Sequence, residues 1–354
     1  MIKGKSKTET TYRELNLDSY TSLKDFSFDR KKYYRKYVLN EVVEEDDSKA
    51  SLMGKLVETL LMEEEEFDNR FFMSSCAKAP TGLMLEFVEA LYRHTKAATD
   101  ENDNVTKDFS ELAELAYKDS GFKIKLQAVI DKFKDSDNEI YYKEIRTVRS
   151  KGLSVVTVDD VKNAEKNVED LRTNPITADI VNLVNSDRYE ILNQFQIEDY
   201  QVDGLHLKSM LDKVIVDHKT QMIDFYDLKC VWAVENFFEE YYLYRRAYIQ
   251  ARLYMEALKS LTGSQHHPWY RYHVKEPKFI VCDSTGYYSP LIYEVDNQSL
   301  SKAYYGFNYR GKEYPGVQKI IKDLQWAVQN DKWNISRQNY IANGKVMINQ
   351  FYGE

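Results

Sequence analysis

Hydrophobic residues recur at helical spacing through the first half of the chain and alternate after residue 187. The helical spacing predicts one or two short helices within 22–40 and further helices over 52–62, 83–94, 108–118, 122–134, 159–172 and 175–185. The alternation predicts strands over 189–197, 204–216 and 222–231. A long helix over 237–258, strands over 278–282 and 291–295, and a closing helix over 317–329 follow. This order predicts an α/β fold with a helical N-terminal part.

We expect a single domain preceded by a tail. Residues 1–20 are polar and predict a flexible tail, whereas no long linker or internal repeat divides residues 21–354. Within this domain we expect residues 21–186 to be mainly helical and residues 187–335 to hold the sheet with its helices. Residues 336–354 would form a C-terminal extension.

A short polar turn over 217–221 separates two of the predicted strands. If the turn centres just after Lys219, Asp212 on the first strand lies directly opposite Asp227 on the second. Their side chains then share one face, with Cβ atoms about 4.5–5.5 Å apart. Lys229 shares that face because side chains alternate along a strand. The pattern therefore predicts that two carboxylates and an ammonium group converge.

Two opposed carboxylates destabilise a sheet unless something compensates their charge. A divalent cation such as Mg²⁺ is a natural compensator, since it is often held by one or two carboxylates, phosphate and water. Lys229 could then hold a water molecule or stabilise developing charge. The alternative is a surface hairpin with a salt bridge. The apolar run 225–231 favours a core strand instead. A charged side chain buried in such a strand is costly unless it is paired with another group.

Four short motifs in order resemble those of one nuclease family. The segments LKSMLDKVIVD and IDFYDLK, which contain Asp212 and Asp227, resemble the second and third motifs of the RecB-type PD-(D/E)XK nucleases. The branch that they most resemble contains phage exonuclease VIII-like proteins. Downstream, QARLY matches the QxxxY motif of this family, and upstream GKLVE matches GxxxH except that Glu58 replaces the histidine. The resemblance covers about residues 20–335.

The resemblance implies a restriction-endonuclease-like core, in which helices flank a mixed central sheet. It implies that Asp212 and Asp227 bind the metal, Mg²⁺ or Mn²⁺, and that Lys229 is the catalytic lysine. Glu58 would occupy the place of the ligand histidine and contribute a further metal ligand. The alternative is that Glu58 lies on the one solvated stripe of its apolar helix, between Lys55 and Glu63. Glu190 opens the strand before the hairpin, where an acidic residue of the family can join the site, although a surface position is the alternative.

The resemblance also implies roles on the helix after the hairpin. Gln250 and Tyr254 are four residues apart and share a helix face, where they would bind DNA or brace the site. Ordinary helix packing is the alternative for both.

The function that we expect is that of a metal-dependent exonuclease on linear duplex DNA, acting in phage-type recombination. The resemblance implies a single-strand annealing protein as partner, and a homo-oligomer is compatible with it. An endonuclease of the same fold and a catalytically decayed DNA-binding protein are the alternatives. Intact Asp212, Asp227 and Lys229 argue against decay.

Charge and composition leave this expectation in place. The net charge of −8 argues against nucleic-acid binding in general, but the two acidic runs 44–47 and 63–66 carry eight negative charges between them. Three widely spaced cysteines form no zinc or disulfide pattern, which favours a reducing, cytoplasmic location. The sequence contains no 18-residue apolar run and no secretory signal, so we expect no membrane partner.

Overall fold

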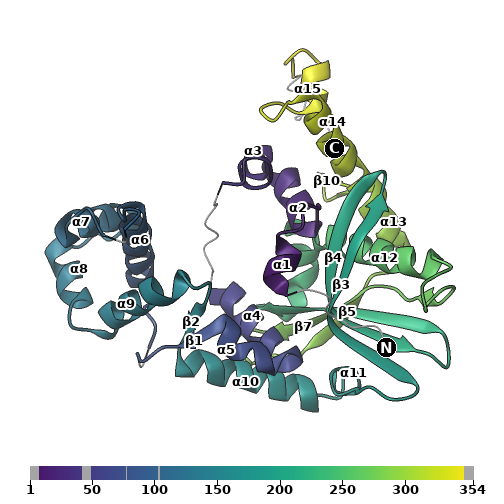
Figure 1. Cartoon of the computed structure of the whole chain (residues 1–354), viewed down its shortest axis with the longest axis horizontal. Coiled ribbons are helices and arrows are strands. Elements are labelled where there is room, and N and C mark those ends of the chain that lie inside the picture. The colour runs from purple at the N-terminus through teal and green to yellow at the C-terminus, as the bar shows by residue number, and fades with distance from the viewer. Residues whose placement is uncertain (1–7, 42–48, 77, 103, 347–354) are drawn as a thin grey trace. The chain divides into compact units, whose positions relative to one another are not determined.

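The computed structural model describes residues 8–41, 49–76, 78–102 and 104–346, and these fall into two compact units (Figure 1). The sheet unit comprises residues 1–48, 170–283 and 287–354, and the helical unit comprises residues 49–169 with 284–286. The range 21–354, which we expected to be one domain, is therefore divided between two units. The parts of the predicted tail and C-terminal extension at 1–7 and 347–354 lie outside the described residues, as does the whole acidic run 44–47.

The sheet unit is built on a mixed sheet, as we expected. Its main strands lie in the order β3-β4-β5-β7-β8, and β6 pairs with β5. Among these six strands, β5 pairs in parallel with β6 and with β7, and the other three pairings are antiparallel. The bounds are β3 Tyr189–Val202, β4 Leu205–Asp217, β5 Met222–Val231, β6 His273–Val274, β7 Lys278–Asp283 and β8 Leu291–Glu294.

The hairpin of β4 and β5 has the predicted register. Asp217 lies opposite Met222, and Lys213 lies opposite Tyr226. The backbone pairing ends there, because β5 continues alongside β7 from Tyr226 to Val231. The two strands therefore begin to separate at the next pair of positions, which are those of Asp212 and Asp227.

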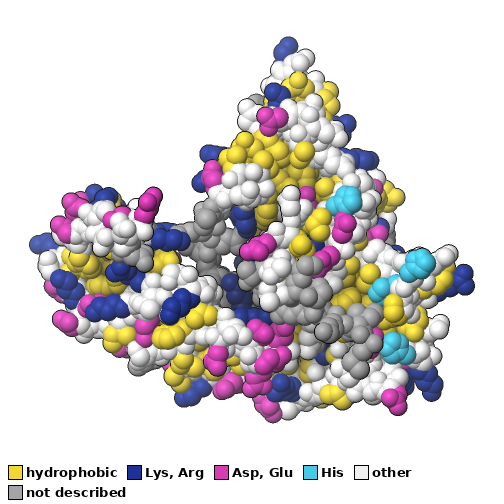
Figure 2. All heavy atoms as spheres, viewed as in Figure 1, with side chains coloured by type: hydrophobic (Ala, Val, Ile, Leu, Met, Phe, Trp, Pro, Cys, Tyr) yellow, Lys and Arg dark blue, Asp and Glu magenta, His cyan; other side chains and the backbone are white. Residues whose placement is uncertain are grey.

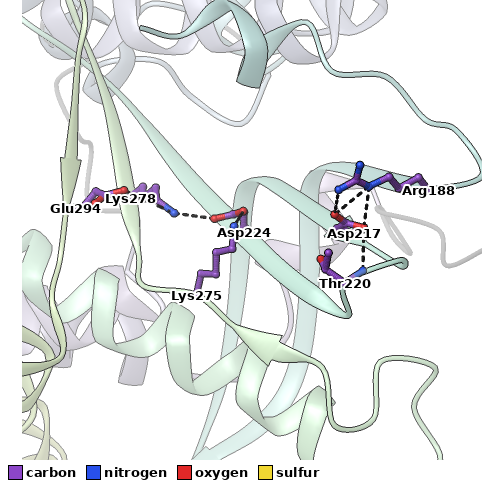
Figure 3. Close-up of polar contacts among 7 residues, drawn as sticks. All are labelled: Arg188, Asp217, Thr220, Asp224, Lys275, Lys278 and Glu294. Atoms are coloured by element: carbon purple, nitrogen blue, oxygen red, sulfur yellow. Dashed lines mark hydrogen bonds and ion pairs between the residues drawn. The ribbon is translucent and has the colours of Figure 1, made fainter.

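Ion pairs hold this part of the sheet together (Figure 3). Asp224 on β5 forms ion pairs with Lys278, the first residue of β7, at 2.7 Å and with Lys275. These ion pairs connect β5 to β7 and to the segment before it. At the turn, Asp217 pairs with Arg188 at 2.6 Å and accepts a hydrogen bond from the backbone N–H of Lys219 at 2.9 Å. These contacts fix the turn, and the turn fixes the register.

The described part of the predicted tail is folded onto β4. The chain over 8–38 forms α1 Glu9–Arg13, α2 Tyr20–Phe28, α3 Arg30–Tyr33 and a π-helical turn Tyr34–Val38. Asp18 forms a parallel bridge with Leu207, where β4 no longer has β5 beside it. The buried Lys208 Nζ donates to the carbonyls of Tyr12, Arg13 and Leu15 at 2.8–2.9 Å. This lysine satisfies backbone acceptors at the end of α1, an interaction that local polarity does not reveal.

The long helix expected over 237–258 is broken in two. A 3₁₀ turn Val234–Asn236 and a π-helix Phe238–Tyr244 precede α12, Ala247–Gly263, and Arg246 between them has a left-handed backbone with φ of 62°. α12 packs against β3 and β4. The remaining elements are α11 Ala178–Val181, α13 Asn297–Tyr305, β9 Gly306–Tyr309, β10 Lys312–Pro315, α14 Val317–Asn330 and α15 Arg337–Ile341.

The helical unit has its own core around Phe87, Leu91, Phe133 and Ile145. Its parallel pair β1–β2 and its helix α9 were not predicted. Its elements are α4 Lys49–Met62, a 3₁₀ turn Glu64–Glu66, α5 Phe67–Arg70, β1 Phe71–Met73, α6 Leu83–Ala97, α7 Phe109–Ser120, α8 Leu126–Phe133, α9 Asp137–Arg149, β2 Ser154–Val156 and the start of α10 Val158–Thr173. Within the ranges that the structure covers, no helix is long and apolar enough to cross a membrane.

Candidate active site

Asp212 and Asp227 meet where β4 and β5 separate. The backbone N–H of Leu228 donates to Asp212 Oδ2 at 2.8 Å, which takes the place of a ladder hydrogen bond between the strands. The two carboxyl groups lie within hydrogen-bonding reach of each other. Asp227 is only 3% exposed, whereas Asp212 is half-buried. We call this point, where β4 parts from β5 at Asp212 and Asp227, the fork. It brings together one buried and one half-buried acidic group.

Lys229 completes this group from the same strand. Its ammonium forms an ion pair with Asp227, and its side chain is 27% exposed. Burial would lower the pKa of Lys229, but the negative charges of Asp227 and Asp212 raise it above its ordinary value. Lys229 is thus held as a cation beside the two carboxyl groups.

The protonation of Asp227 reflects its burial. Burial raises the pKa of Asp227 above its ordinary value, and the contacts with Lys229 and Gln250 lower it only in part. Its Oδ2 atom accepts no hydrogen bond of normal geometry from the residues described, although the lysine lies against it. The buried carboxylate of Asp227 can therefore interact with a further cation.

The helix after the hairpin contacts this site through two side chains. Gln250 Nε2 donates to Asp227 Oδ1 at 2.6 Å and to the hydroxyl of Tyr254 at 2.8 Å. Burial, and then the charge of Asp227, raise the pKa of Tyr254 well above its ordinary value. The structure therefore brings Gln250 and Tyr254 to the pair of carboxyl groups, where Gln250 orients Asp227 and Tyr254 orients Gln250.

The structure does not bring Glu190 to this group. Glu190 lies opposite Val216, four residues from Asp212 along β4, which is about 13 Å at the rise of a strand. Its carboxylate accepts a hydrogen bond from Trp269 Nε1 at 3.3 Å and lies 3.4 Å from His218 Nε2. Its position near the turn, rather than near the fork, explains the difference from the expectation.

Glu58 lies in the helical unit, on α4. It is half-buried, and Leu56 and Val57 beside it are fully buried. The helix expected over 52–62 is confirmed, and Met53, Leu56 and Val57 are its buried apolar residues. The role of Glu58 as a metal ligand stays a prediction.

Two further residues near the fork were missed by the sequence analysis. Burial raises the pKa of Tyr20 at the start of α2, and the nearby charges of Lys229 and Asp227 respectively lower and raise it. The hydroxyl of Tyr20 donates to the carbonyl of Arg245 at 3.1 Å. Gln194 on β3 is 2% exposed and has a left-handed backbone, between the residues of β3 that pair with Leu211 and Lys213. No local motif marks either residue, since both reach the fork through tertiary packing.

The cysteines on β5 and β7 are also closer than their spacing suggested. Cys230 follows Lys229 and lies opposite Cys282 in the parallel register. Both thiols are free. The contact with Cys230, and then burial, raise the pKa of Cys282 well above its ordinary value, so we treat it as a packed thiol.

The donor set at the fork suits a hard cation. Among the described residues, no cluster of three or more His, Cys, Asp or Glu side chains is arranged to hold a metal. Mg²⁺ does not require such a cluster, since it keeps several waters and takes one or two carboxylates together with substrate phosphates. Asp212 and Asp227 meet that requirement, and two carboxyl groups in contact need either a proton or a cation between them.

Sequence comparison does not assign this chain to a family. No protein-family profile matches the chain, and no curated protein matches it. A crystal structure of a "putative exonuclease" from Eubacterium rectale aligns with 97% of this chain and 95% of its own, at 11% sequence identity and a TM-score of 0.49.

Proposed function

We propose that this protein is a metal-dependent DNA nuclease with a PD-(D/E)XK core, and that Asp212, Asp227 and Lys229 form its catalytic centre. The contact between the two carboxyl groups at the fork carries this proposal. Burial of Asp227 beside a second acid is unfavourable for the metal-free protein. Such an arrangement is expected where a divalent cation neutralises it during function.

The residues divide the work of phosphodiester hydrolysis. Asp212 and Asp227 would hold Mg²⁺ or Mn²⁺, which when bound polarises the phosphate and lowers the pKa of a bound water. Lys229, held as a cation, stabilises negative charge that develops on the phosphate oxygens. Gln250 fixes the orientation of the Asp227 carboxylate, as groups behind metal ligands commonly do.

Cleavage of linear duplex DNA in the presence of Mg²⁺ tests this assignment. We expect activity with Mg²⁺ or Mn²⁺ and none in excess EDTA. Asp212→Ala, Asp227→Ala and Lys229→Ala should each lose activity while keeping the wild-type circular dichroism spectrum. Glu294→Gln is a suitable control because Glu294 is exposed on the edge strand β8. Wild-type rates in all three site variants would remove the site from the chemistry.

A comparison of linear and covalently closed circular DNA distinguishes exonuclease from endonuclease activity. We propose exonuclease action, so linear duplex DNA should be degraded from its ends while covalently closed circles survive. Rapid conversion of closed circles to linear DNA would assign the protein as an endonuclease instead. Both assays use the same protein, metal and buffer, so that only the DNA ends differ.

A further inference from the structure

Arg246 has a conformation that the fold alone does not explain. It lies between the π-helix and α12 with φ of 62°, a region in which glycine or asparagine is the usual residue. Arg310 has a similar backbone, but its guanidinium is 72% exposed and pairs with Glu239 at 2.6 Å. Arg246 is different, because its side chain is half-buried and its Nη1 has no hydrogen-bond partner in the described structure. Strained residues of this kind often mark functional positions.

The charge of Arg246 lacks a compensating acid. Burial lowers its pKa, and the groups that oppose this effect are phenols, those of Tyr248, Tyr20 and Tyr314. No carboxylate of the described residues forms an ion pair with it. A guanidinium of this kind is suited to a phosphate, which it can bind with two parallel hydrogen bonds.

Arg246 lies one helical turn before Gln250, which contacts Asp227. Four residues of α-helix span about 6 Å, a distance comparable to the separation of neighbouring phosphates along one strand. Tyr20 lies near Arg246, since its hydroxyl donates to the carbonyl of Arg245 at 3.1 Å and its phenol raises the pKa of Arg246. The charge of Lys229 in turn lowers the pKa of Tyr20, which burial raises. A strand with one phosphate at the fork could therefore present the next phosphate to Arg246.

An aromatic groove continues from Arg246. The guanidinium lies 4.0 Å from the centre of the Phe28 ring, and that ring is 52% exposed. Phe28 lines a groove of about 470 Å³ with Phe26, Arg30, Lys31 and Trp333, among other residues of the sheet unit. Hydrophobic side chains gather between α3 and α14 on the face shown in Figure 2. Aromatic rings interleaved with cations are typical of surfaces that bind single-stranded nucleic acid.

We propose that Arg246 binds the phosphate next to the scissile one, and that Phe28 and the groove beside it stack the bases of an unpaired DNA strand. This inference rests on the proposed function of the fork, and it adds the path of the substrate strand. The groove and Arg246 suit one ligand, because Phe28, which lines the groove, lies against the guanidinium of Arg246.

Binding of a short, fluorescently labelled single-stranded DNA in EDTA tests this path without cleavage. Arg246→Asn keeps a residue that tolerates the left-handed backbone, and we expect binding to weaken about tenfold or more. The slope of log affinity against log salt should become shallower by about 0.7, the value for one lost phosphate contact on a single strand. A purely structural role would leave that slope unchanged.

The groove is tested with Phe28 in the same assay. Phe28→Ala should weaken binding about five- to a hundredfold, the range for loss of one stacked base, whereas Phe28→Trp should retain it. Arg310→Ala and Tyr305→Ala serve as matched controls, because both residues are exposed in the sheet unit and lie outside the groove. We expect both to bind as the wild type does.

The outcomes separate this inference from the nuclease assignment. If wild-type protein shows no metal-dependent cleavage but Arg246→Asn and Phe28→Ala still lose strand binding, the path stands and the nuclease assignment falls. If wild-type protein cleaves DNA and both variants bind and cleave like it, the path is wrong. No measurable binding of the single strand would also overturn it.

Discussion

Replacing Asp227 by asparagine should stabilise the metal-free protein while abolishing its activity. The raised pKa of Asp227 means that the folded state penalises its ionised form at neutral pH, even with Lys229 beside it. Asparagine keeps the hydrogen bond from Gln250 and carries no charge. Lys229 loses one partner but stays partly exposed and close to Asp212. Stability given up for a functional charge is a common property of active sites.

The expected gain is about 1–3 kcal/mol in the free energy of unfolding, the usual penalty for a buried polar group that is not fully compensated. Each kcal/mol corresponds to about 2–4 °C in melting temperature for a unit of this size. The gain should be largest above the raised pKa of Asp227. It should disappear below the ordinary value of 3.8, where wild-type Asp227 is protonated in both folded and unfolded states.

Tryptophan fluorescence during urea unfolding in EDTA measures the stability of the sheet unit, which contains Asp227. All four tryptophans belong to the sheet unit, at positions 232, 269, 326 and 333. Asp224→Asn is a control of opposite sign, because Asp224 on the same strand is compensated by Lys275 and Lys278 and should lose stability when neutralised. If Asp227→Asn unfolds at lower urea than wild type at pH 8, the ion pair with Lys229 outweighs the burial and the reasoning is refuted.

Three further results are expected. Gln250→Ala should raise the Mg²⁺ concentration for half-maximal cleavage about 10- to 100-fold, the usual cost of losing a group behind a metal ligand; an unchanged titration would make Gln250 a packing residue. The Mg²⁺ requirement of the wild type should increase as pH falls, because protons compete for Asp227 with its raised pKa; a flat dependence would contradict this. Lys213 is 4% exposed, and burial lowers its pKa from 10.5 to about 8, so Lys213→Met should add up to about 3 kcal/mol of stability at pH 7. That gain should vanish above pH 10.5, and its persistence there would point to better packing.

The sequence predicted the sheet hairpin well because its determinants are local. Alternating residues on both strands and a polar turn at Asp217 are enough to set the register, and the observed pair Lys213–Tyr226 follows from them. The sequence did not show that the strands separate at Asp212. That separation depends on β7, which is about 50 residues further along the chain and pairs with β5.

The predictions that failed depended on long-range contacts or on unusual backbone conformations. The polar sequence of residues 8–20 predicted a flexible tail. In the structure, however, Lys208, nearly 200 residues further along the chain, forms hydrogen bonds with the backbone carbonyls of this segment. The helix expected over 237–258 has the right apolar spacing, yet it is interrupted at Arg246, where no glycine, proline or asparagine signals a break. Glu190 was considered because it lies near the hairpin in sequence, whereas the sheet register places it at the turn end.

Titration calorimetry with Mn²⁺ in the absence of DNA tests most directly whether Asp212 and Asp227 form a metal centre. We predict one binding site in the wild-type protein, which is lost in Asp212→Asn and in Asp227→Asn but retained in Glu294→Gln. Binding by both site variants with wild-type affinity and stoichiometry would contradict the account, because the two carboxyl groups at the fork would then not hold the metal.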